Sequence, residues 1–363
     1  MTPLRIAAHI SAAEWGGAER RSLALLAGLA ARGHDIAVYC NTPRIAGKAR
    51  EHGLHAVISP LRGDVMIGNA LTLARRLRDQ RPDVLLLITF RRLLLGSLAG
   101  RLARVPRIVC RVGLATDVAR STKYRLLLRH WIDDVVVNAE SLLQPFLASL
   151  PPRARVRVHV IPNGVEPRPA TLARETARSE NGIPADAFVV GCVARLVKQK
   201  RFDRLIEAVA QLDDVHAVIA GDGYMREALH DLAHACGVAD RVHFLGHRED
   251  VGNVHRMLDV YVVSSDQEGM SSGMLEAMAA GLPIVSTRVS GAAEALTASS
   301  TAGVITDFDH CAIAGAIRRL MQDDAARHAM GAAAADMARA RFSADAMIDR
   351  WEVLLLERAG IPE

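Results

Sequence analysis

The stretch that decides the fold is SSDQEGMSSGMLEAMAAGLPIVSTRVSGAAE, residues 264–294. It follows one apolar run, 259–263, and contains a second, 283–287, and each run predicts a buried parallel strand. Between them Ser271 or Ser272 is placed to cap a helix, which Gly281 and Pro283 then end. The unit therefore reads strand, loop, helix, strand, as in a parallel α/β sheet.

Two glutamates of this stretch lie at the predicted sheet edge. Glu268 follows the first strand and Glu276 lies in the first turns of the helix, where open parallel sheets bind ligands. Gly269 lets the backbone approach a ligand, and a helix start suits an anion. Helix capping and a solvated face are the simpler interpretation of such a pair. However, Glu276 lies in the apolar run LEAMAAGLP, and a polyol such as a sugar or ribose would supply donors to both carboxylates.

The segment EGMSSGMLEAMAAGLPIV resembles the Glu-x7-Glu signature of the group 1, or family 4-like, retaining glycosyltransferases. A glutamate pair alone is a weak signal, and the surrounding frame makes the resemblance specific. The resemblance implies an α/β protein of the GT-B fold, in which two Rossmann-like doubly wound parallel-sheet domains face a central cleft.

Length and composition agree with a two-domain α/β enzyme. The chain has 363 residues, 50% hydrophobic and 4% aromatic, enough for two cores. No apolar run approaches the roughly 20 residues of a membrane span, and the first residues read as a strand, so we expect a cytoplasmic protein. Five scattered cysteines, never in CxxC spacing, predict reduced and mostly buried thiols.

Charge is divided unevenly along the chain. Residues 1–165 hold 25 Lys and Arg against 11 Asp and Glu, a net of +14, whereas the remainder holds 20 against 29, a net of −9. A generic solvated surface is one interpretation of the basic half. The other is a face for anionic membrane lipids or a phosphate-linked acceptor. Nucleic acid is disfavoured, because aromatic residues do not interleave with the basic ones.

Strand patterns predict two alternating series separated by a turn-rich linker, IPNGV at 161–165. The expected strands are 4–9, 36–40, 56–58, 84–88, 108–110, 135–137 and 158–161, then 188–193, 215–220, 242–245, 260–263, 284–286 and 304–305. With the resemblance, this gives an N-terminal acceptor-side domain (1–165) and a C-terminal donor-binding domain (166–342). The resemblance also implies that a C-terminal helix, about 343–363, packs back on the first domain.

Several loops of this chain that resemble loops of the family contain candidate donor-binding residues. Arg195 and Lys200 in ARLVKQK match an Arg-x4-Lys diphosphate site, although Arg201 stands where many members carry glycine. Two cations there would neutralise a departing diphosphate; a solvated basic turn is the simpler interpretation. The remaining donor-binding candidates are Gly269, Met270 and Ser271, the first-strand pair Gly16 and Gly17, and the loop residues Gly221 and Leu245.

The resemblance implies transfer of a sugar from a nucleotide diphosphate sugar to a hydroxyl, with retention, in lipopolysaccharide, capsule, exopolysaccharide or glycolipid synthesis. Glu268, Arg195 and Lys200 would be catalytic, and Glu276 would accept from the ribose hydroxyls. The partners would be the donor, a glycan or lipid-linked acceptor and an anionic membrane surface, which makes the protein peripheral at the inner face of the cytoplasmic membrane. No cofactor or metal is needed, and we expect Asp307 and Asp309, despite their Asp-x-Asp spacing, not to form a metal site.

The acceptor side departs from the family. Many members carry a histidine after each of two first-domain strands, where this chain has Arg91 and Arg111. Arg111 would contact an acidic acceptor or contribute only to the basic surface. Alternative functions are a nucleotide-sugar 2-epimerase on the same scaffold, a non-catalytic subunit of a polysaccharide assembly and, less favoured because GxGxxG is absent, a dinucleotide oxidoreductase.

Overall fold

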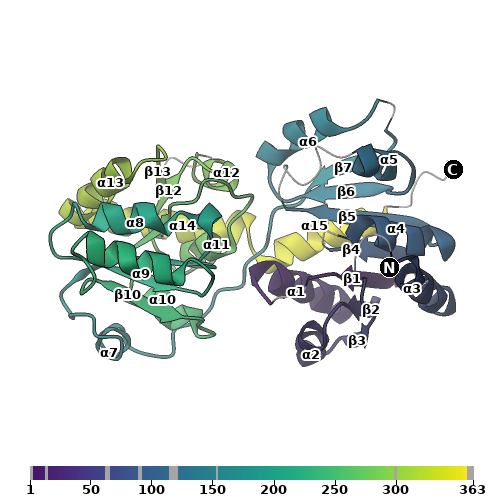
Figure 1. Cartoon of the computed structure of the whole chain (residues 1–363), viewed down its shortest axis with the longest axis horizontal. Coiled ribbons are helices and arrows are strands. Elements are labelled where there is room, and N and C mark those ends of the chain that lie inside the picture. The colour runs from purple at the N-terminus through teal and green to yellow at the C-terminus, as the bar shows by residue number, and fades with distance from the viewer. Residues whose placement is uncertain are drawn as a thin grey trace. The chain divides into compact units, whose positions relative to one another are not determined.

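The computed structural model describes residues 3–12, 15–61, 66–88, 92–113, 122–152, 154–297 and 301–357. It forms two compact units. Unit 1 comprises Met1–Gly164 with Ala344–Glu363, and unit 2 comprises Val165–Ser343 (Figure 1).

Unit 1 is built on a seven-stranded parallel sheet in the order β3-β2-β1-β4-β5-β6-β7. In register, Ala7 pairs with Ala37 on one side and Leu85 on the other. All seven expected strands are present, within two residues at each end. The strands are β1 (Arg5–Ile10), β2 (Asp35–Cys40), β3 (His55–Ile58), β4 (Val84–Leu87), β5 (Arg107–Val112), β6 (Asp134–Val137) and β7 (Arg157–Val160).

Both faces of this sheet are buried, because alternate residues of a strand point to opposite sides. Ile6 and Ala8 of β1 join one apolar cluster and Ala7 joins the other. The first cluster includes buried residues of α1 (Gly17–Ala31), α2 (Pro43–Glu51) and α15 (Ala344–Leu356). The second includes those of α3 (Ile67–Gln80), α4 (Leu93–Leu102), α5 (Thr122–His130), η3 (Glu140–Leu142) and α6 (Leu143–Ser149).

The last helix, α15, is held in unit 1 by charge and by close packing against α1. Arg32 pairs with Asp349 and Glu352, each at 2.5 Å. A Cβ on Gly28 would lie 2.3 Å from Ile348 Cδ1, so glycine allows the two helices to approach closely. Together these contacts explain why the end of the chain returns to the first sheet.

Two arginines counted among the basic residues of the first half are structural. Arg107 is 4% exposed; its Nε pairs with Asp134 at 2.6 Å, and its Nη1 donates to the Leu354 carbonyl of α15 at 2.6 Å. Arg111 is 9% exposed. The interpretation of these two residues as part of a basic surface is therefore wrong, because their charge is buried and hydrogen-bonded inside unit 1.

Unit 2 repeats the architecture with a six-stranded parallel sheet in the order β10-β9-β8-β11-β12-β13, and its expected strands are confirmed. The strands are β8 (Phe188–Val193), β9 (Val215–Ala220), β10 (Val242–Gly246), β11 (Val260–Val263), β12 (Ile284–Thr287) and β13 (Gly303–Thr306). The helices are α7 (Arg174–Ser179), η4 (Lys198–Lys200), α8 (Phe202–Val209), α9 (Arg226–Ala235), α10 (Val251–Met257), α11 (Ser272–Ala279), α12 (Ser290–Thr297), α13 (His310–Gln322) and α14 (Asp324–Arg341).

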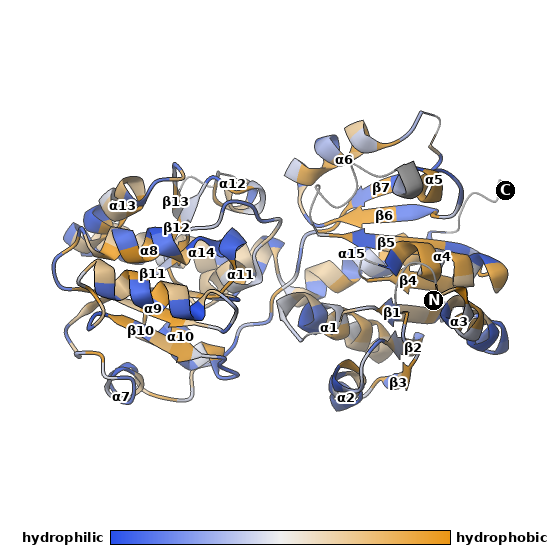
Figure 2. Ribbon diagram, in the orientation of Figure 1, coloured by the Kyte–Doolittle hydropathy of each residue, from blue (hydrophilic) through white to orange (hydrophobic). Residues whose placement is uncertain are grey.

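Figure 2 shows orange, apolar residues along the strands and alternating colours along the helices, as expected for buried parallel sheets under amphipathic helices. The doubly wound α/β prediction is confirmed for each unit. Within the described ranges, no helix is both long and apolar enough to cross a bilayer.

Candidate functional site

The strand order of unit 2 reverses between β8 and β11. The chain proceeds from β8 to β9 and β10 on one side, and from β11 to β12 and β13 on the other. Open parallel sheets bind ligands beyond the carboxyl ends of the strands at such a reversal, where the two following loops diverge. Arg195 and Lys200 follow β8 and Glu268 follows β11, so all three lie in the segments that flank this point.

Lys200 and Glu268 form an ion pair across the reversal. Lys200 Nζ lies 2.6 Å from Glu268 Oε1, and the side chains are 20% and 8% exposed. Ser265 Oγ donates to the same carboxylate oxygen at 2.5 Å. Charges so poorly hydrated persist only when paired and hydrogen-bonded, so the two loops hold each other in place. The sequence predicts that a polyol ligand would donate to Glu268. In the structure, one of the carboxylate oxygens accepts hydrogen bonds from Lys200 and Ser265 within the protein.

Backbone and side-chain bonds join the same two loops along their length. Asp266 N donates to Gln199 O at 3.0 Å, and Ser264 Oγ donates to Lys200 O at 3.0 Å. Arg204 Nη2 pairs with Asp266 at 2.7 Å. The position of Lys200 is therefore determined by its neighbours in the fold as well as by its own ion pair.

Arg201, at the position where the resemblance implies a glycine, has a left-handed backbone conformation that favours glycine. Its φ is +50°, in the left-handed region that ordinary residues seldom occupy. Its guanidinium binds Asp203 at 2.7 Å and Asp266 at 3.2 Å, and the Asp203 hydrogen bond is the main cause that raises its pKa. These ion pairs offset the backbone cost and leave Lys200 in place.

Helix α11 begins beside this ion pair. Gly269, Met270 and Ser271 are buried in the turn that leads into it, and Glu276 is 7% exposed on the helix itself. Ser271 occupies the N-cap position, but its side chain makes no cap hydrogen bond, contrary to our expectation. The helix start therefore depends on the surrounding packing and not on a serine cap.

Two residues that the sequence did not single out support this turn. Tyr261 of β11 is buried, and its hydroxyl contacts both Val193 N at 3.1 Å and Val193 O at 3.2 Å, at the end of β8. A Cβ on Gly273 would lie 2.2 Å from that hydroxyl. Tyrosine and glycine together therefore set the distance between β8, β11 and α11.

Gly291 of α12 also allows close packing, in this case against the turn that follows Glu268. A Cβ there would lie 2.2 Å from the Gly269 carbonyl oxygen and 2.7 Å from Met270 Cα. Helix α12 thus packs directly on the turn after Glu268. The glycine in RVSGAAE was the only sequence signal for this contact. The sequence does not show that Gly291 packs against Gly269, because the two residues are far apart along the chain.

Gly221 and Leu245 lie at the carboxyl ends of the next two strands, β9 and β10. Gly221 has φ +142°, and a Cβ would lie 1.9 Å from the Ala194 carbonyl oxygen, just before Arg195. Its amide donates to Gly246 O at 2.7 Å. Arg195 itself has an exposed side chain. The structure thus brings Gly221, Leu245, Arg195, Lys200 and Glu268 to one edge of the sheet.

In unit 1 the order reverses between β1 and β4, and Gly16 and Gly17 follow β1. Gly16 is the extended N-cap of α1; a Cβ there would lie 3.2 Å from Glu19 Oε2, and the Gly16 carbonyl accepts from Arg20 N at 3.0 Å. Gly17 is the first residue of the helix. The pair therefore stands at a helix start near a strand-order reversal, as a phosphate-approaching loop requires.

The two acceptor-side arginines differ in what the structure shows. Arg91 lies outside the described residues. Arg111 donates from Nη1 to Ser22 Oγ of α1 at 3.0 Å and from Nη2 to Asn163 Oδ1 at 2.5 Å. Burial lowers its pKa to about 10 against the opposing effect of Glu19. Arg111 therefore connects β5 to α1 and to the end of unit 1.

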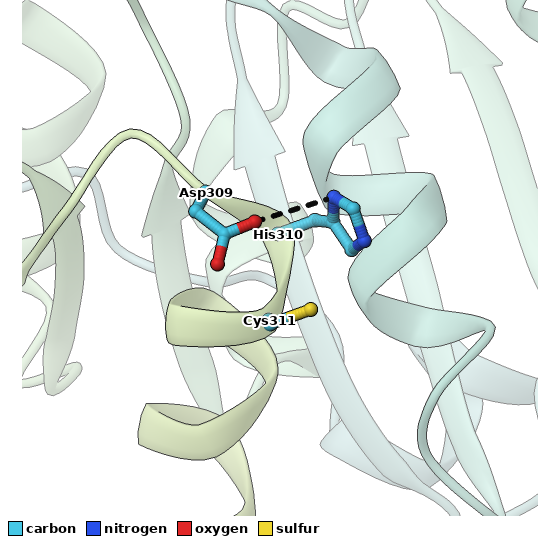
Figure 3. A group of neighbouring side chains, drawn as sticks. All are labelled: Asp309, His310 and Cys311. Carbon is cyan, nitrogen blue, oxygen red and sulfur yellow. Dashed lines mark ion pairs between the residues drawn. The ribbon is translucent and has the colours of Figure 1, made fainter.

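One group of possible metal ligands occurs among the described residues, at the start of α13: Asp309, His310 and Cys311 (Figure 3). His310 Nδ1 lies 3.6 Å from Asp309 Oδ1 and 3.3 Å from Glu207 Oε2 of α8. Asp309 and Cys311 are exposed, and Asp307 does not belong to the group. These contacts join α13 to α8.

Two parallel α/β units, each with candidate ligand-binding residues at its strand-order reversal, define the class as GT-B. Residues 173–337 match the family described as glycosyl transferases group 1, and residues 15–168 match Glycosyltransferase Family 4. The chain therefore belongs to the GT-B glycosyltransferases of these families.

Particular relatives are similar over part of the chain. The lipopolysaccharide core biosynthesis glycosyltransferase LpsD of Rhizobium meliloti is 34% identical, over 53% of this chain and 56% of that protein. The GDP-mannose-dependent alpha-(1-6)-phosphatidylinositol monomannoside mannosyltransferase of Mycobacterium tuberculosis is 31% identical, over 62% and 60%. The matches thus span little more than half the length of these curated relatives.

Solved structures match the whole fold. Anabaena HepE, solved with UDP and glucose, has a TM-score of 0.86 at 20% identity, covering 98% of this chain and all of that one. WaaG, a glycosyltransferase involved in lipopolysaccharide biosynthesis, has a TM-score of 0.75 at 20% identity, covering 97% of this chain and 100% of that one. At this identity the likeness establishes the fold alone.

Proposed function

We propose that the chain transfers a sugar, with retention, from a nucleoside diphosphate sugar to a hydroxyl of a glycan or lipid-linked acceptor in polysaccharide or glycolipid synthesis. The observation that carries the proposal is the Lys200–Glu268 ion pair at the strand-order reversal of unit 2. A cation and an acid at such a reversal, where open α/β sheets bind ligands, suit a nucleotide sugar.

Lys200 is suited to a departing diphosphate. An ammonium has three N–H donors, and Glu268 occupies one of them, so phosphate oxygens can accept from the others. Arg195, exposed in the same segment, adds a second positive charge. Preorganised cations of this kind act where negative charge develops as the glycosidic bond breaks. The proposed chemistry draws its positive charge from these side chains, so transfer should persist in EDTA.

We assign the remaining roles from the positions of the residues. Glu276, buried on α11, accepts from the ribose hydroxyls. Glu268 and the turn 269–271 orient the donor sugar, with Gly221 and Leu245 beside the nucleotide. We also assign Gly16 and Gly17 of unit 1 to donor binding, and Arg91 to acceptor binding. Arg111 contributes to acceptor binding by holding α1 through Ser22.

A panel of nucleotide sugars tests this proposal, with donor hydrolysis and transfer measured separately. We expect one donor to be turned over and transferred to an added acceptor with the anomeric configuration kept. Glu276→Ala should lower turnover about 10²-fold or more. Donor conversion to an isomer without an acceptor would favour the epimerase alternative, and binding without turnover would favour the non-catalytic subunit.

We also propose a cytoplasmic protein that works at the surface of the cytoplasmic membrane. The support is the net charge of +14 on residues 1–165, which suits anionic lipids. Fractionation of cells that express the full chain tests the location; release from membranes by salt would support it.

A further inference from the structure

Helix α3 of unit 1 has an inner face that the core explains and an outer face that it does not. Ala70, Leu73, Ala74 and Leu77 are buried against the sheet. The opposite stripe, Ile67, Leu71, Arg75 and Arg78, recurs at helical spacing and is exposed. The exposed face of the helix is therefore divided along its length: its first half carries apolar side chains and its second half carries basic ones.

The apolar half is unusually exposed. Met66 is 53% exposed, Ile67 56% and Leu71 44%. Ile58, at the end of β3, adds a fourth aliphatic side chain at 41%. Arg76 Nη1 donates to the Ile58 carbonyl at 2.8 Å, which places the end of β3 beside α3. These four side chains, Ile58, Met66, Ile67 and Leu71, form what we call the α3 apolar patch.

The basic half keeps its charge. Arg76 and Arg78 donate to backbone carbonyls, of Ile58 and Leu102, which orient the guanidinium groups without neutralising them. Between residues 66 and 104 the sequence holds eight arginines and two aspartates. One of the aspartates, Asp83, pairs with Arg5. Positive charge thus predominates around the α3 apolar patch.

We infer that this outer face of α3, with its apolar patch and Arg75 and Arg78, docks the protein on an anionic lipid membrane. The inference rests on the proposed function and deepens it, by naming the surface through which a lipid-linked acceptor is reached. Aliphatic side chains enter the headgroup region while arginines bind anionic headgroups, as in helices that lie on a membrane.

A second copy of the chain suits this face less well. A stable protein interface buries roughly 800 Å² on each partner, more than four partly exposed side chains provide. Two copies would also bring arginines of like charge together. Membrane binding has neither difficulty, because each arginine near an anionic surface strengthens binding about fivefold.

Flotation of the full chain with vesicles tests the inference. Vesicles of phosphatidylcholine alone are compared with equimolar phosphatidylcholine and phosphatidylglycerol. The two test variants are Ile67→Ser with Leu71→Ser, and Arg75→Gln with Arg78→Gln. Leu147→Ser, an exposed leucine of α6, controls for apolar loss. Arg319→Gln with Arg339→Gln, on α13 and α14 of unit 2, controls for net charge.

We expect wild type and both controls to bind only the anionic vesicles, and both α3 variants to bind at least tenfold more weakly. Equal binding by the α3 variants, equal loss in the controls, or no wild-type binding would overturn the inference. So would a dimer in solution that Ile67→Ser with Leu71→Ser dissociates. Donor hydrolysis and transfer to a water-soluble acceptor should stay at the wild-type level in that variant. Their absence in wild type would refute the proposed function instead.

Discussion

Lys200 Nζ lies 2.6 Å from Glu268 Oε1, and this contact joins the segments that follow β8 and β11. The two residues are 68 positions apart in sequence. Parallel strands with a reversal between them bring the residues to the same edge. The ion pair fixes the position of the Lys200 ammonium group and stabilises the two loops that it joins.

Lys200→Met should lower sugar transfer about 10²-fold, because a preorganised positive charge is lost. It should also lower the thermal unfolding temperature, because Glu268 is left poorly hydrated, with Ser265 still donating to it but without its cationic partner. Adding Glu268→Gln should restore stability without restoring transfer, which a double-mutant cycle would show. Lys198→Met, on the exposed side of the same turn, is the matched control; an equal loss there would exclude a specific role for Lys200.

Gly291→Ala should raise the KM for the donor about tenfold or more, with the fold retained. The added methyl group would displace the Gly269 carbonyl and so the turn after Glu268. Gly315→Ala on α13 is the control, because its Cβ would meet only Arg319 Nη1, at 3.9 Å. It should leave KM unchanged and stabilise the helix by about 1 kcal/mol. An unchanged KM in Gly291→Ala would show that the turn does not contact the donor.

Unit 1 should lose stability as the pH falls from about 6.5 towards 4. His9 is 2% exposed, and burial lowers its pKa to about 4 although its hydrogen bond to the Ser59 carbonyl opposes this. Because the unfolded chain binds the proton first, stability is complete above the unfolded pKa of about 6.5 and falls by about 3 kcal/mol across this window.

Urea unfolding at several pH values measures this effect. His9→Gln cannot titrate but can still donate to Ser59 O. In this variant the fall in unfolding free energy between pH 6.5 and 4 should be smaller by about 3 kcal/mol, so that the slope of stability against pH is lower. Ser59→Ala keeps the carbonyl and should retain the wild-type slope. If His9→Gln followed the wild-type curve, another group would be responsible.

Asp134→Asn should destabilise unit 1 by about 3–5 kcal/mol, because it removes the negative charge that pairs with the arginines Arg107 and Arg157. Burial alone would raise the pKa of Asp134, but hydrogen bonds from His159, Arg107 and Arg157 outweigh it and hold the pKa well below its usual range. The ionised carboxylate therefore stabilises the fold at neutral pH, and that contribution is lost as the pH falls below about 3.9.

Hydrogen exchange would locate the effect, since Arg107 also donates to the Leu354 and Glu357 carbonyls at the end of α15. Amides of α15 should lose protection in Asp134→Asn. Asp79→Asn, an exposed aspartate on α3, should behave as wild type. If the amides of α15 kept full protection in Asp134→Asn, the Arg107–Asp134 ion pair would not be needed to hold α15 in place.

Much of the fold was predictable because buried parallel strands leave a local signal. Runs such as 188–193 and 215–220 are apolar and bounded by turn residues, so period and composition locate them without any tertiary contact. The order of the loops along the chain then places Lys200 and Glu268 at strand ends. The frame around Glu268 and Glu276 was specific enough to indicate the family.

Contacts between distant residues were not predictable in this way. Arg107 and Arg111 have the same sequence signal as any surface arginine, and only Asp134, Ser22 and Asn163 show that their charges are buried. Gly291 and Tyr261 likewise become important only beside Gly269 and Val193.

The sequence by itself determined the two α/β units, their strands and the loops that carry charge, since hydrophobic period and turn chemistry act over a few neighbouring residues. The tertiary structure alone decided which charges pair, which arginines are buried, and which face of α3 stays uncovered. Pairing and burial depend on distances between segments far apart in the chain, and no local pattern encodes these.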